Sequence, residues 1–288
     1  MFDGFAQAIF SVNGANINYK LGGKGPPLLL LHGFPQSHVH WHAVAPLLES
    51  DFSLVVPDLR GYGDSTGPGL DPEHLNYSKR TMGNDMVALM DKLGYEHFGV
   101  AGHDRGARVA YRLTLDYPQK VIRLASLDTI PTLDTWESMD MSVALDAFHW
   151  LFLAQPAPVP EKLMGGDPDF FIEHLLDRWA GSTGALNQEA VSIYKEHFRK
   201  PSVLQAMAED YRAGATIDLA HDKQDRESGK RIQCPVFVPY GEKYTGDSLL
   251  DTWKLWASDI SELRIDCGHF IAEEEPTICA NALKSFFN

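Results

Sequence analysis

The stretch Gly102-His103-Asp104-Arg105-Gly106-Ala107-Arg108 decides the fold of this chain. A short apolar run precedes it and an amphipathic run follows it. This order of strand, glycine-flanked turn and helix is typical of a nucleophile elbow, a sharp turn that exposes the side chain at its apex. The two glycines lack the Cβ atoms that would clash in such a turn. The apex residue is Asp104, so we expect a carboxylate nucleophile.

Two arginines near this apex violate the local preferences of a helix start. Arg105 and Arg108 share one face of the first helical turn and repel each other. Both also lie at the positive end of the helix dipole, where cations are disfavoured. A bound anion would relieve both conflicts, because guanidinium groups match the geometry of a carboxylate. We therefore expect an anion site beside Asp104; arginines that point to solvent or pair with structural acids are the alternative.

Short apolar runs alternate with helical patterns on both sides of this elbow. Runs that are apolar throughout, such as 27–31, are typical of parallel strands buried on both faces. The alternation predicts a doubly wound α/β sheet with ligands at the carboxyl ends of its strands. An Asn-Gly turn at 13–14 predicts an N-terminal hairpin. The expected strands are 5–12, 16–21, 27–31, 52–56, 98–101, 121–127, 235–241 and 263–266, and the expected helices are 39–48, 78–93, 105–117, 248–256 and one from 273.

The alternation stops near Pro131. Residues 131–219 show no strand pattern and are rich in aromatic residues and proline. We predict that they form a helical cap inserted into a core domain made of residues 1–130 and 220–288. The alternative is that these helices are only a second packing layer.

The composition is acidic. Lysine and arginine number 25 and aspartate and glutamate 39, which gives a formal net charge of −14. This charge argues against nucleic acid or an anionic membrane as a partner. It would also repel an anionic substrate unless charges at the site outweigh those beyond a Debye length of about 8 Å.

The sequence shows no signal peptide and no apolar run long enough to span a membrane. Its three cysteines are odd in number and lack metal-ligand spacing. They predict reduced thiols in a cytoplasmic protein without a metal site.

A histidine near the end of the chain is the candidate base. His269 follows the last expected strand, where the chain order nucleophile, acid, histidine closes a catalytic triad. Ser65, in Gly63-Asp64-Ser65-Thr66-Gly67, matches the serine-hydrolase pattern by letter. It does not stand between a strand and a helix, so we interpret it as a loop serine.

Several motifs together resemble the α/β-hydrolases of the fluoroacetate dehalogenase (haloacetate dehalogenase) group. The resemblance covers essentially the whole chain. It implies an α/β-hydrolase fold, with a mostly parallel eight-stranded sheet, helices on both faces and an inserted helical cap. Epoxide hydrolases and haloalkane dehalogenases share part of the pattern, but usually carry tryptophan where Arg105 stands. The motifs are His32-Gly33-Phe34-Pro35, the run from Asp58 to Ser65, the elbow, His149-Trp150, Asp210-Tyr211-Arg212 and Gly268-His269.

The resemblance implies a role for each of nine side chains. These are Asp104 as nucleophile, His269 as base, Asp128 as the acid that orients the histidine, Arg105 and Arg108 as ligands of the substrate carboxylate, His149, Trp150 and Tyr211 as ligands of the leaving halide, and Phe34 in the pocket beside the oxyanion hole. Glu242 and Asp247 lie in the loop where many α/β-hydrolases place the acid, so they are the alternatives to Asp128.

The implied reaction is hydrolytic dehalogenation of a small anionic haloacid, fluoroacetate or chloroacetate, to glycolate. An ionised carboxylate displaces the halide and forms an ester, which water activated by the histidine then hydrolyses. The resemblance implies no cofactor and a homodimer. Two alternatives are an epoxide hydrolase that uses Tyr211 as a proton donor, against which the paired arginines argue, and a hydrolase-fold receptor that binds its ligand without turnover.

Overall fold

A single sheet of eight strands forms the centre of the molecule in a computed structural model that describes residues 1–288. The strand order is β1-β2-β4-β3-β5-β6-β7-β8. The strand pairs β1–β2 and β2–β4 are antiparallel, and all the others are parallel. The predicted fold class is thereby confirmed. The strands are β1 Ala6–Val12, β2 Ala15–Gly23, β3 Pro27–Leu31, β4 Ser53–Pro57, β5 Phe98–His103, β6 Val121–Leu127, β7 Val236–Gly241 and β8 Ile260–Ile265.

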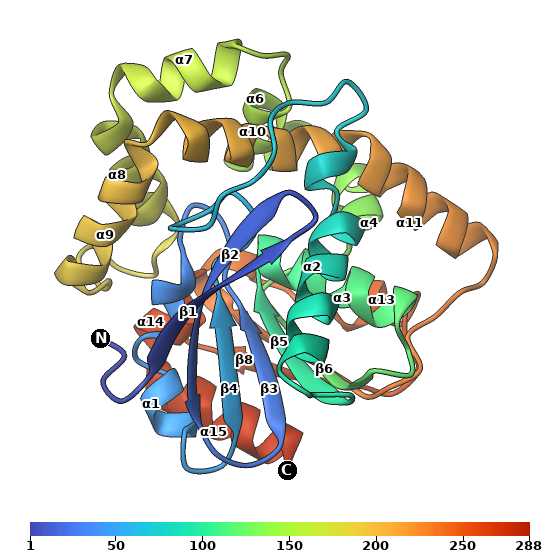
Figure 1. The fold of residues 1–288 in the computed structure, drawn as a ribbon. Helices are drawn as coiled ribbons and strands as arrows, with labels where there is room; N and C mark the ends of the chain where they lie inside the picture. Colours follow the sequence, from blue (N-terminus) through green and yellow to red (C-terminus); the bar gives the residue numbers. More distant parts are fainter.

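Helices cover both faces of the sheet, and a further group follows β6 (Figure 1). None of them combines the length and the apolar character that crossing a membrane requires. The helices outside this group are η1 His38–Trp41, α1 Ala45–Leu48, η2 Leu75–Tyr77, α2 Lys79–Lys92, α3 Arg105–Asp116, α12 Glu242–Thr245, α13 Leu250–Trp253, α14 Ile271–Glu274 and α15 Pro276–Phe287. Those between β6 and β7 are α4 Thr132–Glu137, α5 Met141–Asp146, α6 Phe148–Leu153, α7 Val159–Gly166, α8 Pro168–Trp179, α9 Gln188–Phe198, α10 Pro201–Ala215 and α11 Ile217–Glu227.

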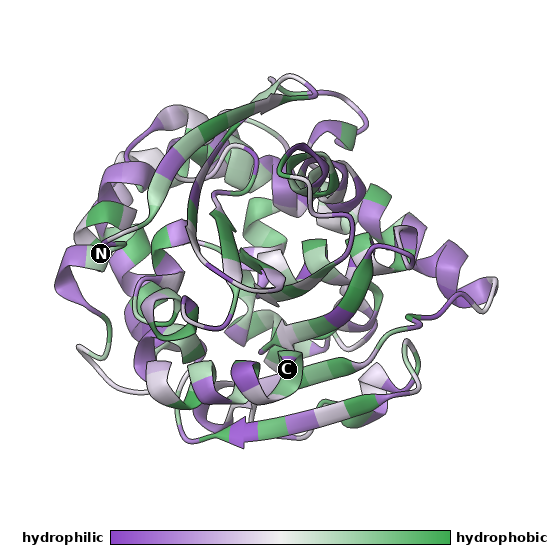
Figure 2. Ribbon diagram, turned by 60° about the horizontal axis from the view of Figure 1, so that its bottom comes forward, coloured by the Kyte–Doolittle hydropathy of each residue, from purple (hydrophilic) through white to green (hydrophobic).

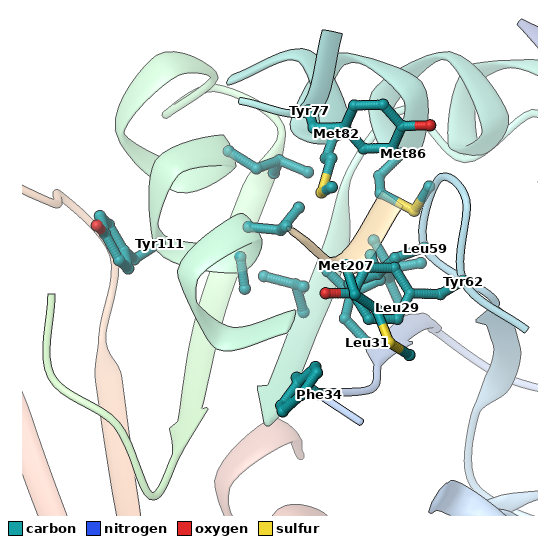
Figure 3. Packing of buried hydrophobic residues seen from close by; sticks show 14 of the residues in the cluster. Leu29, Leu31, Phe34, Leu59, Tyr62, Tyr77, Met82, Met86, Tyr111 and Met207 are labelled. Carbon is teal, nitrogen blue, oxygen red and sulfur yellow. The ribbon is translucent and has the colours of Figure 1, made fainter. Parts of the chain in front are cut away.

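Alternate residues of the inner strands pack on opposite faces of the sheet. Leu29 and Leu31 of β3 join the cluster under α2 and α3, whereas Leu28 and Leu30 join the cluster under α1 and α15. β3 is therefore apolar at every position, and Figure 2 shows much of the inner strands in green beside helices of mixed colour. Figure 3 shows the first cluster, with Phe34 at its edge.

Two helices expected from the sequence are each interrupted by proline. The expected helix 39–48 is η1 followed by α1, because Pro46 is accommodated only in the first turn of a helix. The expected last helix is α14 followed by α15. Pro276 disfavours helical geometry in the residue before it, and Glu275 accordingly has φ −130° and ψ 57°.

The helices α6–α10 lie across the end of the sheet where the parallel strands terminate (Figure 1). The predicted boundary between residues 219 and 220 falls inside α11. This helix contacts α3, since its Asp222 accepts a hydrogen bond of 2.5 Å from Arg112.

The turn between β5 and α3 is as sharp as the glycines predict. Asp104 has φ 46° and ψ −114°, a conformation that L-residues rarely adopt. A Cβ atom on Gly102 would lie 2.5 Å from the carbonyl oxygen of Gly106, and one on Gly106 would lie 2.3 Å from that of His32. Any side chain at either position therefore requires the backbone to move.

We expect Gly106→Ala to lower the free energy of unfolding by about 1–3 kcal/mol, the usual cost of overpacking a core. Chemical denaturation followed by tryptophan fluorescence measures it. Gly165→Ala is the control, since its Cβ would meet nothing closer than Leu204 Cδ1 at 3.6 Å. Equal stability of the two variants would contradict the steric account of the elbow.

Candidate active site

Three strand ends bring a carboxylate, a histidine and a second carboxylate together. Asp104 follows β5, Asp128 follows β6 and His269 lies beyond β8, and all three are buried. His269 Nδ1 lies 2.6 Å from Asp128 Oδ2. The other oxygen of Asp128 accepts hydrogen bonds from the Gly241 amide at 2.9 Å and the Thr245 hydroxyl at 2.7 Å. With Nδ1 donating to Asp128, the Nε2 atom of the imidazole is free to act as a base.

The two alternative acids lie away from the histidine. Glu242 forms an ion pair with Arg264 near the surface. Asp247 is exposed in the same loop. Of the three acids considered from the sequence, Asp128 is thus the one that contacts His269.

Asp104 is a buried anion held by hydrogen bonding and by neighbouring positive charge. Its Oδ1 accepts a hydrogen bond of 2.9 Å from the Phe34 amide. Burial by itself would raise the pKa of Asp104, but electrostatic interaction with its neighbours, which include His269, Arg105 and Arg108, holds this pKa below its ordinary value. The carboxylate is therefore ionised at neutral pH, as a nucleophile requires.

Arg105 is fully buried and paired with an acid from the inserted helices. Its Nη2 donates to Asp210 Oδ1 and to the Asp210 carbonyl oxygen, both at 2.7 Å, and its Nε lies 3.2 Å from Oδ2. The guanidinium carbon lies 4.1 Å from the centre of the Tyr211 ring. Only Nη1 lacks a hydrogen-bond partner. Most of the Arg105 guanidinium thus pairs with a structural acid, which was the alternative to an anion site in the sequence analysis.

Arg108 is also buried, but its hydrogen-bond partners are hydroxyl groups and not a carboxylate. Its two Nη atoms lie 3.4 Å from Thr132 Oγ1 and 3.1 Å from Thr135 Oγ1, and its Nε has no partner. The guanidinium lies 4.5 Å from the centre of the Trp150 ring. Burial and the charge of Arg105 lower the pKa of Arg108, yet an arginine stays protonated in proteins. A buried cation of this kind favours an anionic ligand.

The side chains expected to bind halide form one aromatic cluster. The Tyr211 ring lies 5.6 Å from both the His149 and the Trp150 ring, and Phe34 stacks at 6.0 Å on His149. Tyr211 Oη and His149 Nδ1 are buried without hydrogen-bond partners. Such groups are costly unless a ligand or water satisfies them. Burial lowers the pKa of His149 to about 3 and raises that of Tyr211, so both are neutral at pH 7 and the tyrosine keeps its proton.

A cavity of about 260 Å³ lies among these groups. Arg105, Tyr211 and Phe34 do not line it, but each contacts a residue that does: Trp150 for the first two and Asp104 for Phe34. The side chains that line it are Asp104, Arg108, Asp128, Thr129, Ile130, Thr135, Ser138, Val143, Ala147, His149, Trp150, Trp179, Tyr244, Thr245, Leu249 and His269.

Two aromatic residues at this cavity were not predicted from the sequence. The Trp179 ring lies 4.6 Å from that of His149, and the Tyr244 ring lies 4.3 Å from that of His269. Trp179 ends α8 in the aromatic-rich insertion, so composition gave a weak signal for it. Tyr244 lies in the loop that we searched only for acids.

A further buried carboxyl group, that of Glu273, lies just beyond the histidine loop. Glu273 Oε1 lies 2.7 Å from the Tyr194 hydroxyl and 3.6 Å from His42 Nδ1, and its Oε2 lies 2.6 Å from Gln36 Nε2. Burial raises the pKa of Glu273 to about 8, from an ordinary value of 4.5. Glu273 is therefore mostly protonated at neutral pH.

This raised pKa predicts how stability depends on pH. The folded protein binds the Glu273 proton more tightly than the unfolded chain does. The stabilisation is therefore complete below pH 4.5 and is lost as the pH rises to about 8. Relative to Glu273→Gln, which cannot ionise, we expect the parent to lose about 1.4 kcal/mol of unfolding free energy per pH unit over this window. Denaturation of both proteins between pH 5 and 9 measures the difference in their unfolding free energies. The other titrating groups are the same in both proteins, so their contributions cancel. A difference that does not change with pH would contradict the shift.

The fold and this site together define a class of protein. A polar residue at a sharp turn after β5, with an acid and a histidine beyond the ends of other strands, is the spatial arrangement found in α/β-hydrolases. The sequence profile of the alpha/beta hydrolase fold family matches residues 26–276, and the chain belongs to this family.

Within this family, the chain is similar to individual enzymes of known class. The chain is 43% identical to a fluoroacetate dehalogenase from a Burkholderia species, with 100% of this chain and 95% of the relative aligned. It is 31% identical to a soluble epoxide hydrolase from Corynebacterium sp. strain C12, over 96% of this chain and 95% of that one. A protein assigned as an epoxide hydrolase from Pseudomonas aeruginosa, solved with bound MFA, superposes with a TM-score of 0.93 at 43% identity, covering 99% and 96% of the two chains. The expected membership of this enzyme family, with its resemblance to fluoroacetate dehalogenases, is confirmed.

Proposed function

We propose that the protein hydrolyses the carbon–halogen bond of a short 2-haloacid, fluoroacetate or chloroacetate, through an ester on Asp104. The observation that carries this proposal is Arg108, a buried cation without a carboxylate partner that lines the same cavity as an ionised aspartate. The fluoroacetate dehalogenase at 43% identity supports the choice of substrate.

In the first half of the reaction, Arg108 and the free Nη1 of Arg105 bind the substrate carboxylate. An Asp104 oxygen attacks the carbon that bears the halogen, the carbon–halogen bond breaks, and halide leaves with the electron pair. No base is needed, because the carboxylate is already ionised.

As the halide leaves it gains negative charge, and His149, Trp150 and Tyr211 donate hydrogen bonds to it. Hydrogen bonds to a charged group contribute roughly 1.5–3 kcal/mol each, so three donors lower the barrier by about 4–9 kcal/mol before ordering costs. This corresponds to about three to six powers of ten in rate. The buried Tyr211 hydroxyl, which has no other partner, is the donor that this role requires.

In the second half, His269 removes a proton from water, and the water oxygen attacks the Asp104 carbonyl carbon. The Phe34 amide, 2.9 Å from Asp104 Oδ1, stabilises the oxyanion, together with the amide that follows Asp104. Asp128 supports the imidazolium. The ester C–O bond then breaks, and glycolate leaves with the proton that the imidazolium returns. The second water proton passes from the Asp104 carboxyl group to solvent, which regenerates the carboxylate.

An epoxide hydrolase is the second candidate, because the relative from Corynebacterium and the free Tyr211 hydroxyl both fit it. A neutral epoxide would leave the charge of Arg108 buried without an anion, so we favour the haloacid. A receptor that binds without turnover would consume no substrate. The cap of residues 131–219, the homodimer, the cytoplasmic location and the lack of a cofactor stay predictions.

We expect the purified protein to release halide from fluoroacetate or chloroacetate with steady turnover. In His269→Asn, displacement should proceed but hydrolysis should stop, because no base activates water. Mass spectrometry should then find the Asp104 peptide esterified. A parent that releases no halide, together with a variant that traps no ester, would overturn the dehalogenase; turnover of a neutral epoxide instead would select the second candidate.

Arg108→Gln tests carboxylate recognition. Loss of a hydrogen bond to a charged group costs roughly 1.5–3 kcal/mol, so we expect kcat/KM for chloroacetate to fall about 10- to 100-fold. The kcat/KM for the neutral analogue chloroacetamide should fall much less. An equal fall in kcat/KM for both compounds would show that Arg108 does not bind the substrate carboxylate.

A further inference from the structure

One carboxylate, Glu274, accepts three backbone hydrogen bonds around the candidate base. Its Oε2 accepts from the Gly268 amide at 3.0 Å, and its Oε1 accepts from the Phe270 amide at 3.0 Å. These amides belong to the residues immediately before and after His269. The same Oε2 accepts from the Gly181 amide at 2.7 Å. Gly181 lies just beyond α8, so this carboxylate joins the histidine loop to the inserted helices.

Close backbone packing accompanies these hydrogen bonds. A Cβ atom on Gly181 would lie 2.5 Å from the Gly268 nitrogen, and one on Gly268 would lie 2.1 Å from the Gly181 nitrogen. The two segments therefore approach as closely as only glycine allows. Beside this contact, the His269 amide donates to the Trp179 carbonyl oxygen at 2.8 Å.

The main chain of His269 is thus held at every available group. Its own amide bonds to Trp179, its carbonyl oxygen lies 2.8 Å from His103 Nε2, and the flanking amides bond to Glu274. The ring is oriented separately by Asp128. Asp128 fixes the orientation of the imidazole ring, whereas the loop contacts fix the position of the His269 backbone relative to Asp104.

We propose that Glu274 is a positioning residue for His269, and that it acts specifically on the hydrolysis of the ester. This inference rests on the proposed function, in which displacement uses Asp104 without a base and hydrolysis needs His269. A shift of about 1 Å in a catalytic group can cost on the order of 10²-fold in rate. Loosening the Glu274 contacts should therefore slow the second half-reaction and leave the first one intact.

The test is Glu274→Gln with chloroacetate, followed by rapid quench and mass spectrometry. Glutamine keeps the shape, but its NH₂ group donates and cannot accept from the backbone amides. We expect halide release in the first turnover within about twofold of the parent, ester hydrolysis slower by at least about tenfold, and esterified Asp104 accumulating at steady state. Glu275→Gln is the matched control, because the Glu275 side chain does not cap α15.

Gly181→Ala is a second, independent variant, which separates the same segments while keeping Glu274. Gly166→Ala is its control, since a Cβ there would meet nothing within 4 Å. We expect the same accumulation of ester in Gly181→Ala and parental behaviour in Gly166→Ala. Ester hydrolysis at the parental rate in Glu274→Gln, or equal slowing of both half-reactions, overturns the positioning role. A parent that forms neither halide nor ester overturns the proposed function, and with it the assigned half-reaction.

Discussion

Keeping Asp104 ionised while burying it is the constraint on which the rest of the site depends. Removing a carboxylate from water costs several kcal/mol unless charges and hydrogen bonds compensate. Here the Phe34 amide and cationic neighbours provide this compensation. The elbow holds Asp104 at a positive φ of 46°, the flanking glycines permit the close packing of the turn, and the Asp104 side chain lines the cavity.

The two arginines meet this constraint in different ways. Arg105 is paired with Asp210, which also binds Lys79 and the Tyr62 hydroxyl, so its guanidinium is held rigidly against the Tyr211 ring. Arg108 makes its direct contacts with two threonine hydroxyls and a tryptophan ring, and forms no ion pair within the protein. The net charge of −14 is thus compatible with an anionic ligand, because Arg108 lines the cavity and charges farther away than a screening length contribute little there.

Features set by local sequence were predictable, and features set by distant contacts were not. The elbow at Asp104, the apolar inner strands and the histidine after β8 each follow from a few adjacent residues. The pairing of Arg105 with Asp210 joins side chains 105 positions apart, and the Thr245 contact to Asp128 joins residues 117 apart. No periodicity or motif spacing encodes such pairs, because the packing of α10 and of the loop after β7 creates them. For the same reason the sequence singled out both arginines but did not distinguish the paired one from the unpaired one.

The two half-reactions draw on different parts of the molecule, and one short segment connects them. Halide binding would use His149, Trp150 and Tyr211, which all come from the inserted helices. Ester hydrolysis would use the loops at the strand ends. Trp179 belongs to both, because its ring lies 4.6 Å from that of His149 while its carbonyl oxygen receives the amide of His269. A displacement of α8 would therefore change the halide site and the position of the base together. In the proposed reaction the inserted helices would define both the leaving-group site and the placement of the base, so substitutions far from Asp104 in this insertion would alter which step limits turnover.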